Sequence, residues 1–123
     1  MTISTRQLVA YAHVADVERS IRFYADLGFS VADRVAPEGS TTPVWAWLES
    51  GQANLMVGLA SEPVDPTRQA VLFYLYYDDI RQTHAALKAL GHDPGEIRFP
   101  FYMPGGEFRV HDPDGYVLML AQS

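Results

Sequence analysis

Hydrophobic and polar residues recur along this chain with two different periods, and the changes of period mark the predicted elements. Residues 17–28 and 80–91 carry apolar side chains at the spacing of one helix face, and both stretches end in glycine. The other apolar stretches are short, rich in β-branched and aromatic residues and bounded by turn-forming residues, which predicts strands. These strands are expected at residues 6–14, 29–35, 44–50, 54–60, 70–77, near 97, 107–111 and 116–122.

The order of these elements repeats once along the chain. Asp16 and Asp79, each placed to cap a helix, are 63 residues apart (79 − 16 = 63), and the helix-ending glycines match at the same shift. Each half is too small to bury its own sheet face, so we predict an α+β fold of two paired βαβββ modules. Their curved mixed sheets would surround a cleft, with the helices on the outer faces.

The chain is expected to form a single domain over residues 1–123. Module one spans about 1–60, a proline-containing linker about 61–69, and module two about 70–123. This length suits one domain with a sizeable core.

Composition narrows the classes of partner. The formal net charge is −6 and no Lys/Arg cluster occurs, which argues against nucleic acid. No segment reaches membrane-spanning length, and the N-terminus lacks the pattern of a signal peptide. Without cysteine there is neither a disulfide nor a thiolate metal site. We therefore expect a soluble cytoplasmic protein, without nucleic-acid or membrane partners, whose acidic balance favours a cationic ligand.

Two stretches of the sequence carry a family resemblance. "FRVHDPDGYVLML" places a tight turn at Asp112-Pro113-Asp114-Gly115 before an apolar strand. Together with "HVADVERSIRFYADLGF", it resembles the vicinal-oxygen-chelate superfamily, which contains glyoxalase I, extradiol dioxygenases, fosfomycin-resistance enzymes and bleomycin-resistance proteins. The resemblance covers the whole chain in order. It implies paired βαβββ modules, a ligand in the cleft between them, and a homodimer.

The resemblance also locates the positions at which enzymes of this superfamily hold a divalent metal with His and Glu side chains. Here these four positions carry Val9, Met56, Leu72 and Met119, which pair off at the repeat shift (72 − 9 = 63 and 119 − 56 = 63). None offers a nitrogen or oxygen, and a thioether suits Cu(I) at best. The resemblance therefore implies no metal and no other cofactor, as in the metal-free bleomycin-resistance-like members.

Strand alternation extends these positions into a candidate pocket, because every second residue faces the same side. Arg109 falls on a ligand-contacting position of the family, and a loop hinged by Gly105-Gly106 would form the rim. The candidate ligand-binding residues are Val9, Tyr11, His13, Asn54, Met56, Leu72, Tyr74, Tyr76, Phe101, Tyr102, Met103, Glu107, Arg109 and Met119.

The face of the strand on which Trp45 and Trp47 lie is harder to infer. The repeat shift sets Trp45 and Trp47 against Phe108 and Val110, which suggests the helix side of the sheet. A bulge in the strand would reverse that orientation.

Three functions follow from these residues. The first is metal-free binding of a small molecule, sequestering an aromatic or cationic compound such as an antibiotic. The alternative is a lyase, isomerase or dioxygenase, with a non-standard metal site from His13, Glu107 and His111 or with His13 or Glu107 as a metal-free general base. The third is a structural or regulatory protein whose four apolar positions close a dry core. No catalytic residue is identified from the sequence.

The donor set yields the first testable prediction. Elemental analysis of the purified protein is expected to find no stoichiometric transition metal, because the four family positions lack hard or borderline donors. One equivalent of bound manganese, iron, nickel or zinc would overturn the metal-free interpretation.

Overall fold

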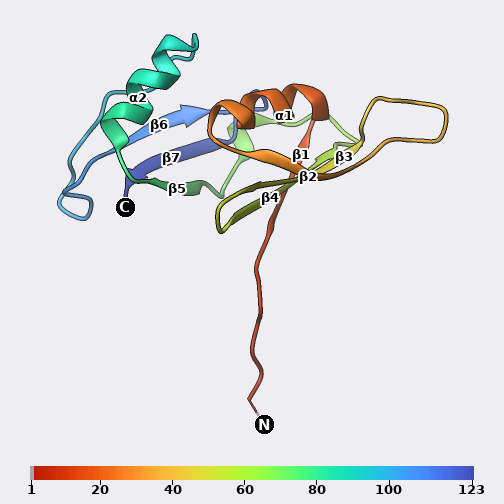
Figure 1. Cartoon of the computed structure of the whole chain (residues 1–123), viewed down its shortest axis with the longest axis horizontal. Helices are drawn as coiled ribbons and strands as arrows, with labels where there is room; N and C mark the ends of the chain where they lie inside the picture. Colours follow the sequence, from red (N-terminus) through yellow and green to blue (C-terminus); the bar gives the residue numbers. More distant parts are fainter. Residues whose placement is uncertain (1) are drawn as a thin grey trace. The chain divides into compact units, whose positions relative to one another are not determined.

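The computed structural model describes residues 2–123, which divide into two compact units. Unit 1 ends at Val64 and unit 2 begins at Asp65. Each unit combines one long helix with one mixed sheet, of four strands in unit 1 and three in unit 2 (Figure 1). The predicted α+β class is therefore confirmed.

Unit 1 contains a four-stranded sheet in the order β1-β4-β3-β2, in which β1 runs parallel to β4 and the other pairs are antiparallel. Its elements are β1 (Ala10–Val14), α1 (Val17–Asp26), β2 (Ser30–Val35), β3 (Trp45–Ser50) and β4 (Ala53–Leu59).

The first predicted strand, residues 6–14, is shorter in the structure. It begins only at Ala10, which pairs with Leu55, and residues 2–9 run outward from the sheet as an extended segment (Figure 1). Strand composition alone does not make a strand, because each one needs a neighbour to satisfy its backbone groups. Only two residues of β4 precede Leu55, so little of that neighbour remains.

Unit 2 contains a three-stranded sheet in the order β5-β7-β6, with β5 parallel to β7 and β6 antiparallel to it. Its elements are the short 3₁₀ helix η1 (Pro66–Arg68), β5 (Phe73–Tyr77), α2 (Ile80–Ala89), β6 (Glu107–His111) and β7 (Val117–Gln122).

The strand predicted near residue 97 is reduced to one isolated bridge between Arg98 and Glu107. Pro94 and Pro100 flank this stretch. Proline lacks the N–H that a ladder requires, so the pairing cannot extend far in either direction.

Both helices begin and end where the sequence predicts. The carboxylates of Asp16 and Asp79 each accept a hydrogen bond at 3.0 Å from the backbone N–H three residues later. Gly28 and Gly91 follow the two helices with φ of 103° and 94°, the left-handed conformation that closes a helix.

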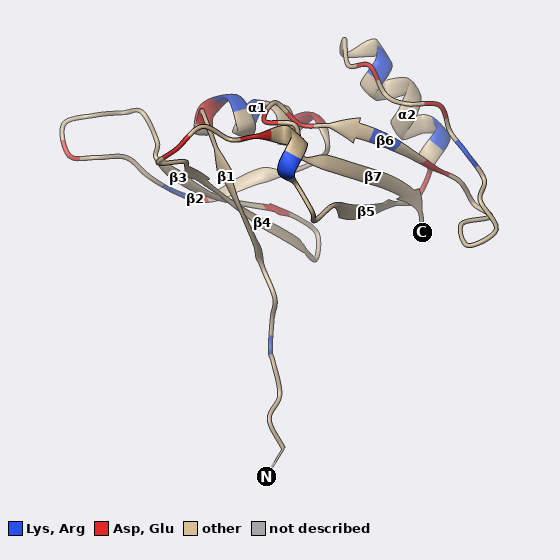
Figure 2. Ribbon diagram, turned by 180° about the vertical axis from the view of Figure 1, so that it is seen from behind, with Lys and Arg blue, Asp and Glu red and all other residues tan. Residues whose placement is uncertain are grey.

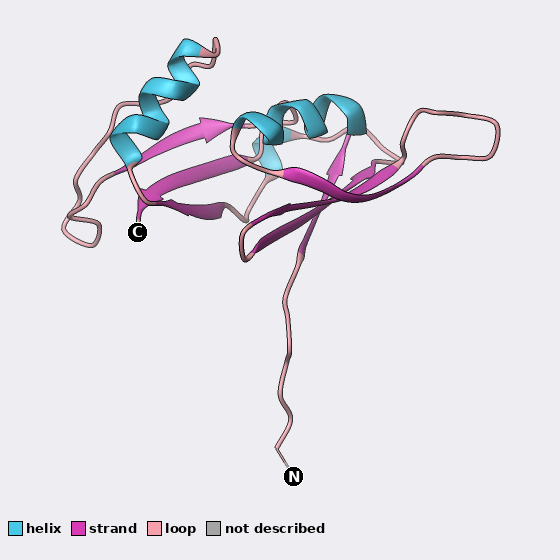
Figure 3. Cartoon of the chain, viewed as in Figure 1, coloured by secondary structure: helices cyan, strands magenta, loops and turns pink. Residues whose placement is uncertain are grey.

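Each helix covers one face of its own sheet (Figure 3), and most of the apolar core of the strands lies on that face. In unit 1 this helix side includes Ala46, Leu48 and Val57, and in unit 2 it includes Phe108 and Leu118, all between 0 and 1 % exposed. We call the opposite side of each sheet its open face. Because the core lies under the helix, the helix does not cover the side chains on the open face of the same sheet.

The two tryptophans lie on the open face, which corrects their suggested place on the helix side. Trp47 pairs with Met56 and Trp45 with Gly58, and residues directly paired across antiparallel strands share a face. Their neighbour Ala46 is fully buried on the helix side.

A difference in turn length between the units explains the error. Ser50 pairs with Ala53 across a two-residue turn, whereas His111 and Val117 are separated by five residues. Met56 and Met119 keep the 63-residue shift, but the structural equivalent of Trp47 is Arg109, at a shift of 62 (109 − 47 = 62). A one-residue change of register moves every side chain of a strand to the other face.

The charged residues of the helices are dispersed. Helix α1 carries two acidic and two basic residues, Glu18, Arg19, Arg22 and Asp26, and the basic residues of α2 occur singly (Figure 2). Within residues 2–123, neither helix has the length and apolar character needed to cross a membrane.

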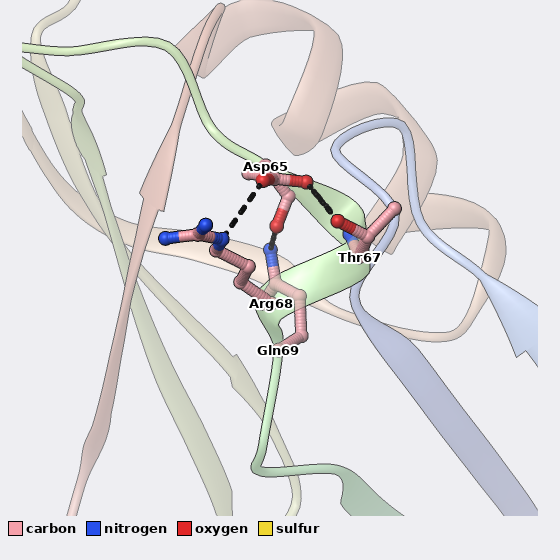
Figure 4. Close-up of polar contacts among 4 residues, drawn as sticks. All are labelled: Asp65, Thr67, Arg68 and Gln69. Atoms are coloured by element: carbon pink, nitrogen blue, oxygen red, sulfur yellow. Dashed lines mark hydrogen bonds and ion pairs between the residues drawn. The ribbon is translucent and has the colours of Figure 1, made fainter.

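The start of unit 2 is stabilised by its own first carboxylate (Figure 4). Asp65 caps η1: its Oδ1 accepts a hydrogen bond of 2.6 Å from the Thr67 hydroxyl. The Asp65 carbonyl accepts a bond from the Gln69 side chain, and Arg68 Nε lies 3.6 Å from Asp65 Oδ2. These contacts fix a compact turn within the proline-containing linker.

The turn at residues 112–115 forms as predicted. Asp112 is 4 % exposed, and its Oδ1 accepts hydrogen bonds of 2.9 Å from the backbone N–H groups of Asp114 and Tyr116. Gly115 has a φ of 88°, and an added Cβ there would overlap Pro66 of η1. The turn therefore packs directly against the start of unit 2.

This packing predicts unequal costs for two glycine substitutions. Gly91→Ala introduces only an unfavourable positive φ, because nothing lies within 4 Å of the added methyl, and is expected to lower the free energy of unfolding by about 1 kcal/mol. Gly115→Ala adds the overlap with Pro66 and is expected to cost about 2–4 kcal/mol. Urea unfolding measures both, and equal losses would contradict the packing of the turn on Pro66.

Candidate functional site

A cavity of about 360 Å³ opens beside β6 in unit 2. The cavity has an apolar lining of Phe108 and Met119, which we call its floor, and three exposed charged residues, Glu96, Arg98 and Arg109, which we call its rim. Its lining residues are Gly95, Glu96, Arg98, Glu107, Phe108, Arg109 and Met119. This volume falls in the range of small-molecule sites, which combine apolar walls with a few orienting polar groups.

The most buried charge in this cavity is the carboxylate of Glu107, a residue only 5 % exposed. Its Oε1 accepts a hydrogen bond from the Tyr74 hydroxyl at 3.2 Å, and its Oε2 accepts one from Tyr102 at 3.3 Å. Ala121 of β7 pairs with Glu107, so the cross-strand neighbour of this carboxylate is a small residue. The carboxylate is thus held by two neutral donors.

The hydroxyl of Tyr74 in this contact remains protonated over a wide pH range. Desolvation, followed by the hydrogen bond and charge of Glu107, raises the pKa of the Tyr74 hydroxyl. A neutral hydroxyl can donate to the carboxylate, whereas a phenolate would repel it.

Arg109 lies on the same face of β6 as Glu107, two residues further along, beside Met119. It is exposed, and no hydrogen bond or ion pair of its side chain is found within residues 2–123. The other two charges of the rim lie next to each other, with Arg98 Nη2 at 3.9 Å from Glu96 Oε2. Within the described residues, Arg109 is therefore the charge of the rim that has no partner.

A histidine outside the predicted site holds one wall of the cavity. His84 of α2 places its Nε2 at 2.9 Å from the carbonyl oxygen of Gly95, and its ring packs edge-on against Phe108. The Gly95 N–H donates to the carbonyl of Arg109 at 2.8 Å. His84 thus ties the segment before β6 to the helix. Its sequence neighbours give no signal of this role, because both contacts join distant parts of unit 2.

The structure brings together five of the predicted residues of unit 2. Met119, Glu107 and Arg109 line the cavity, and Tyr74 and Tyr102 contact Glu107.

The other predicted residues of unit 2 lie outside this group. Tyr76 stacks on Tyr74, with ring centroids 6.1 Å apart, and is otherwise exposed. Leu72 is 43 % and Phe101 95 % exposed, and neither lines the cavity. Met103 is half-buried, and its carbonyl accepts the Gly106 N–H in a turn. Of the three residues predicted on the loop before β6, only Tyr102 contacts a residue that lines the cavity.

The predicted residues of unit 1 lie on or beside its open face. Met56 and Asn54 face the same side as Trp47, whose Nε1–H donates to Asn54 Oδ1 at 3.0 Å. The other residues of unit 1 that were predicted for the site are Tyr11, His13 and Val9. The rings of Tyr11 and His13 on β1 lie 5.1 Å apart, and Val9 is half-buried just before that strand.

Glycine makes room for one of these aromatic side chains. Tyr11 lies over Gly58, where an added Cβ would overlap its hydroxyl. Tyr11 was predicted from the sequence, whereas Trp45 and Trp47, which lie on the same face, were not predicted there.

The donor groups do not fit a divalent metal. The four family positions carry apolar side chains, and no group of three or more His, Cys, Asp or Glu residues that could hold a metal occurs within residues 2–123. Glu107 and His111, two members of the alternative metal set, are four residues apart on one strand, or about 13 Å. Metal–ligand bonds are about 2 Å long, so these two side chains cannot share an ion.

The comparisons with known proteins agree with this architecture. The model of the Glyoxalase/Bleomycin resistance protein/Dioxygenase superfamily matches residues 8–120. A comparison with curated proteins gives no match.

Several solved structures share the fold. The bleomycin resistance determinant encoded on transposon Tn5 has a TM-score of 0.78 and 23% identity, with 97% of this chain and 98% of that chain covered. A bleomycin-binding protein complexed with bleomycin has a TM-score of 0.76 and 23% identity, covering 97% and 99%. TnmS3, an antibiotic binding protein from Streptomyces sp. CB03234, has a TM-score of 0.70 and 26% identity, covering 99% and 98%.

The hydrogen bond to Glu107 predicts a specific loss of stability. Tyr74→Phe removes one donor from a buried carboxylate and is expected to lower the free energy of unfolding by about 1 kcal/mol. Tyr76→Phe is the matched control, because its hydroxyl has no hydrogen bond within residues 2–123. Thermal or urea unfolding at pH 7 compares them, and an equal effect would contradict the role assigned to Tyr74.

Proposed function

The chain belongs to the glyoxalase/bleomycin resistance protein/dioxygenase superfamily, and we propose that it is a metal-free protein that binds and sequesters a small organic molecule. The ligand class proposed is an aromatic or cationic compound, such as an antibiotic. No bond of the ligand is made or broken in this function.

One observation carries the proposal: Met119 lines the cavity at a position where the family resemblance implies a carboxylate ligand in the metal-dependent members. A thioether is flexible and polarizable, so it adapts to the shape of an apolar group. The floor therefore favours contact with a ligand over coordination of a cation.

The neighbouring structures support the choice of ligand class. Two of them are a bleomycin-binding protein and an antibiotic binding protein. Their binding partners are transferred to this chain as a proposal, because similar folds can carry different functions.

The remaining parts of the proposal concern assembly and location. We propose that the protein acts as a homodimer and that it is cytoplasmic. The dimer follows from the family and from the strand edges that open sheets leave unpaired, such as β2 and β5.

A metal-free acid–base enzyme is the second candidate function, and the position of Glu107 favours it. This carboxylate lines the cavity, and a general base needs only to reach the proton that it abstracts. The two candidates differ in what happens to the ligand. A sequestering protein releases its ligand unchanged, whereas a lyase or isomerase releases a product that mass spectrometry detects.

Binding can be tested with a panel of antibiotics and aromatic compounds that includes metal-free bleomycin. Titration followed by tryptophan fluorescence and calorimetry, in the presence of a chelator, is expected to show saturable binding of at least one compound. Absence of binding across the panel would overturn the proposed function.

Substitutions then assign that binding to the cavity. Met119→Lys places a charge on the cavity floor and is expected to weaken binding at least tenfold, while the smaller change Met119→Ala weakens it less. Leu90→Lys is the matched control, because Leu90 is 58 % exposed at the end of α2 and does not line the cavity. Circular dichroism checks that each variant folds. Equal affinities for Met119→Ala and Leu90→Lys would place the ligand elsewhere.

A further inference from the structure

Glu107 and Arg109 carry opposite charges on one face of one strand, yet they do not pair. Both line the cavity beside β6. Their Cα atoms are two residues apart, which along a strand is about 7 Å. Long side chains span that distance easily, so an ion pair between them would be the ordinary arrangement.

The tyrosine contacts explain why the pair does not form. Tyr74 and Tyr102 each donate to one oxygen of the Glu107 carboxylate, which directs it toward β5 and the loop before β6. Arg109 instead lies beside Met119 at the exposed part of the cavity. Neutral hydroxyls hold the carboxylate in place without cancelling its charge.

The other charges around the cavity do not alter this separation. Glu96 and Arg98 lie 3.9 Å apart, and their side chains are 81 % and 78 % exposed. Because they offset each other and are well solvated, they add little to the field inside. The cavity therefore has one fixed negative group at depth and one unpaired positive group at its mouth.

We propose that this cavity recognises a dipolar ligand, with a protonated nitrogen at Glu107 and an anionic group at Arg109. The inference rests on the proposed small-molecule binding and narrows its ligand class to zwitterions. Charges held apart before binding are complementary to such a ligand and need no rearrangement to receive it. A ligand carrying only a cation would gain at Glu107 but be repelled by Arg109.

Three probes of similar shape separate the contribution of Glu107 to binding from that of Arg109. 4-(Aminomethyl)benzoate carries both charges across one ring, about the spacing of two residues along a strand. Benzylamine carries only the cation, and 4-methylbenzoate only the anion. Calorimetry at pH 7 and low salt is expected to give a dissociation constant at least tenfold lower for the zwitterion than for either of the others.

Variants assign each charge to its residue. Glu107→Gln is expected to weaken the zwitterion and benzylamine about tenfold and not to weaken 4-methylbenzoate, from which it removes a like charge. Arg109→Gln is expected to weaken the two carboxylates about tenfold, and Arg109→Lys to recover part of that loss. Arg98→Gln is the matched control, since Arg98 lines the cavity but lies beside Glu96. It is expected to change every affinity less than threefold.

The outcomes distinguish this inference from the proposed function. If all three probes bind equally, or if Arg98→Gln acts like Arg109→Gln, recognition of a dipole is overturned while binding in the cavity stands. If none of the three binds, the inference is overturned, and the antibiotic panel then decides the proposed function separately. Because Glu107→Gln keeps an acceptor for one tyrosine, circular dichroism and unfolding measurements check that it retains the fold.

Discussion

The pairing of strands across β7 is the constraint on which the site of unit 2 depends. Tyr74 and Arg109 pair with Met119 from opposite sides, and Glu107 pairs with Ala121. This register puts a carboxylate above a small residue, where tyrosine hydroxyls can reach it. The same register puts the guanidinium beside a thioether. A shift of one residue in β6 would turn both charges under the helix, into the core.

The sequence was sufficient for features that depend on local chemistry. Asp16 and Asp79 cap their helices because the carboxylate of an extended N-cap residue accepts a hydrogen bond from a free N–H of the first turn, whatever the tertiary context. The Asp112 turn and the glycines after the helices follow from equally local rules. The α+β class followed from the order of these elements and from their repetition.

Features that depend on pairing between strands were harder to predict. The repeat shift holds for Met56 and Met119 but changes by one residue at Trp47, because the two hairpins differ in turn length. Residues 6–9 have strand composition but no partner in the sheet. The contacts of Glu107 join residues 33 and 5 positions away in sequence, so no motif announces them.

At the four positions where the resemblance places the metal ligands of superfamily enzymes, the chain has Val9, Met56, Leu72 and Met119, none of which offers a nitrogen or oxygen donor. Of these four, Met119 lines the cavity of unit 2, where its thioether contributes contact area and adaptability. Binding energy would then come from apolar burial and from a few fixed charges. Under the proposed function, such a site would recognise a molecule by shape and charge and would leave the ligand chemically intact.

Selective methyl labelling of methionine tests this account most directly, because the chain has only 4 methionines and one of them, Met119, lies in the cavity. With a chelator present and a ligand from the antibiotic panel added, we predict a saturable shift of the Met119 methyl resonance. Binding that leaves this resonance unchanged, or that occurs only after a divalent metal is added, would contradict a metal-free small-molecule site at Met119.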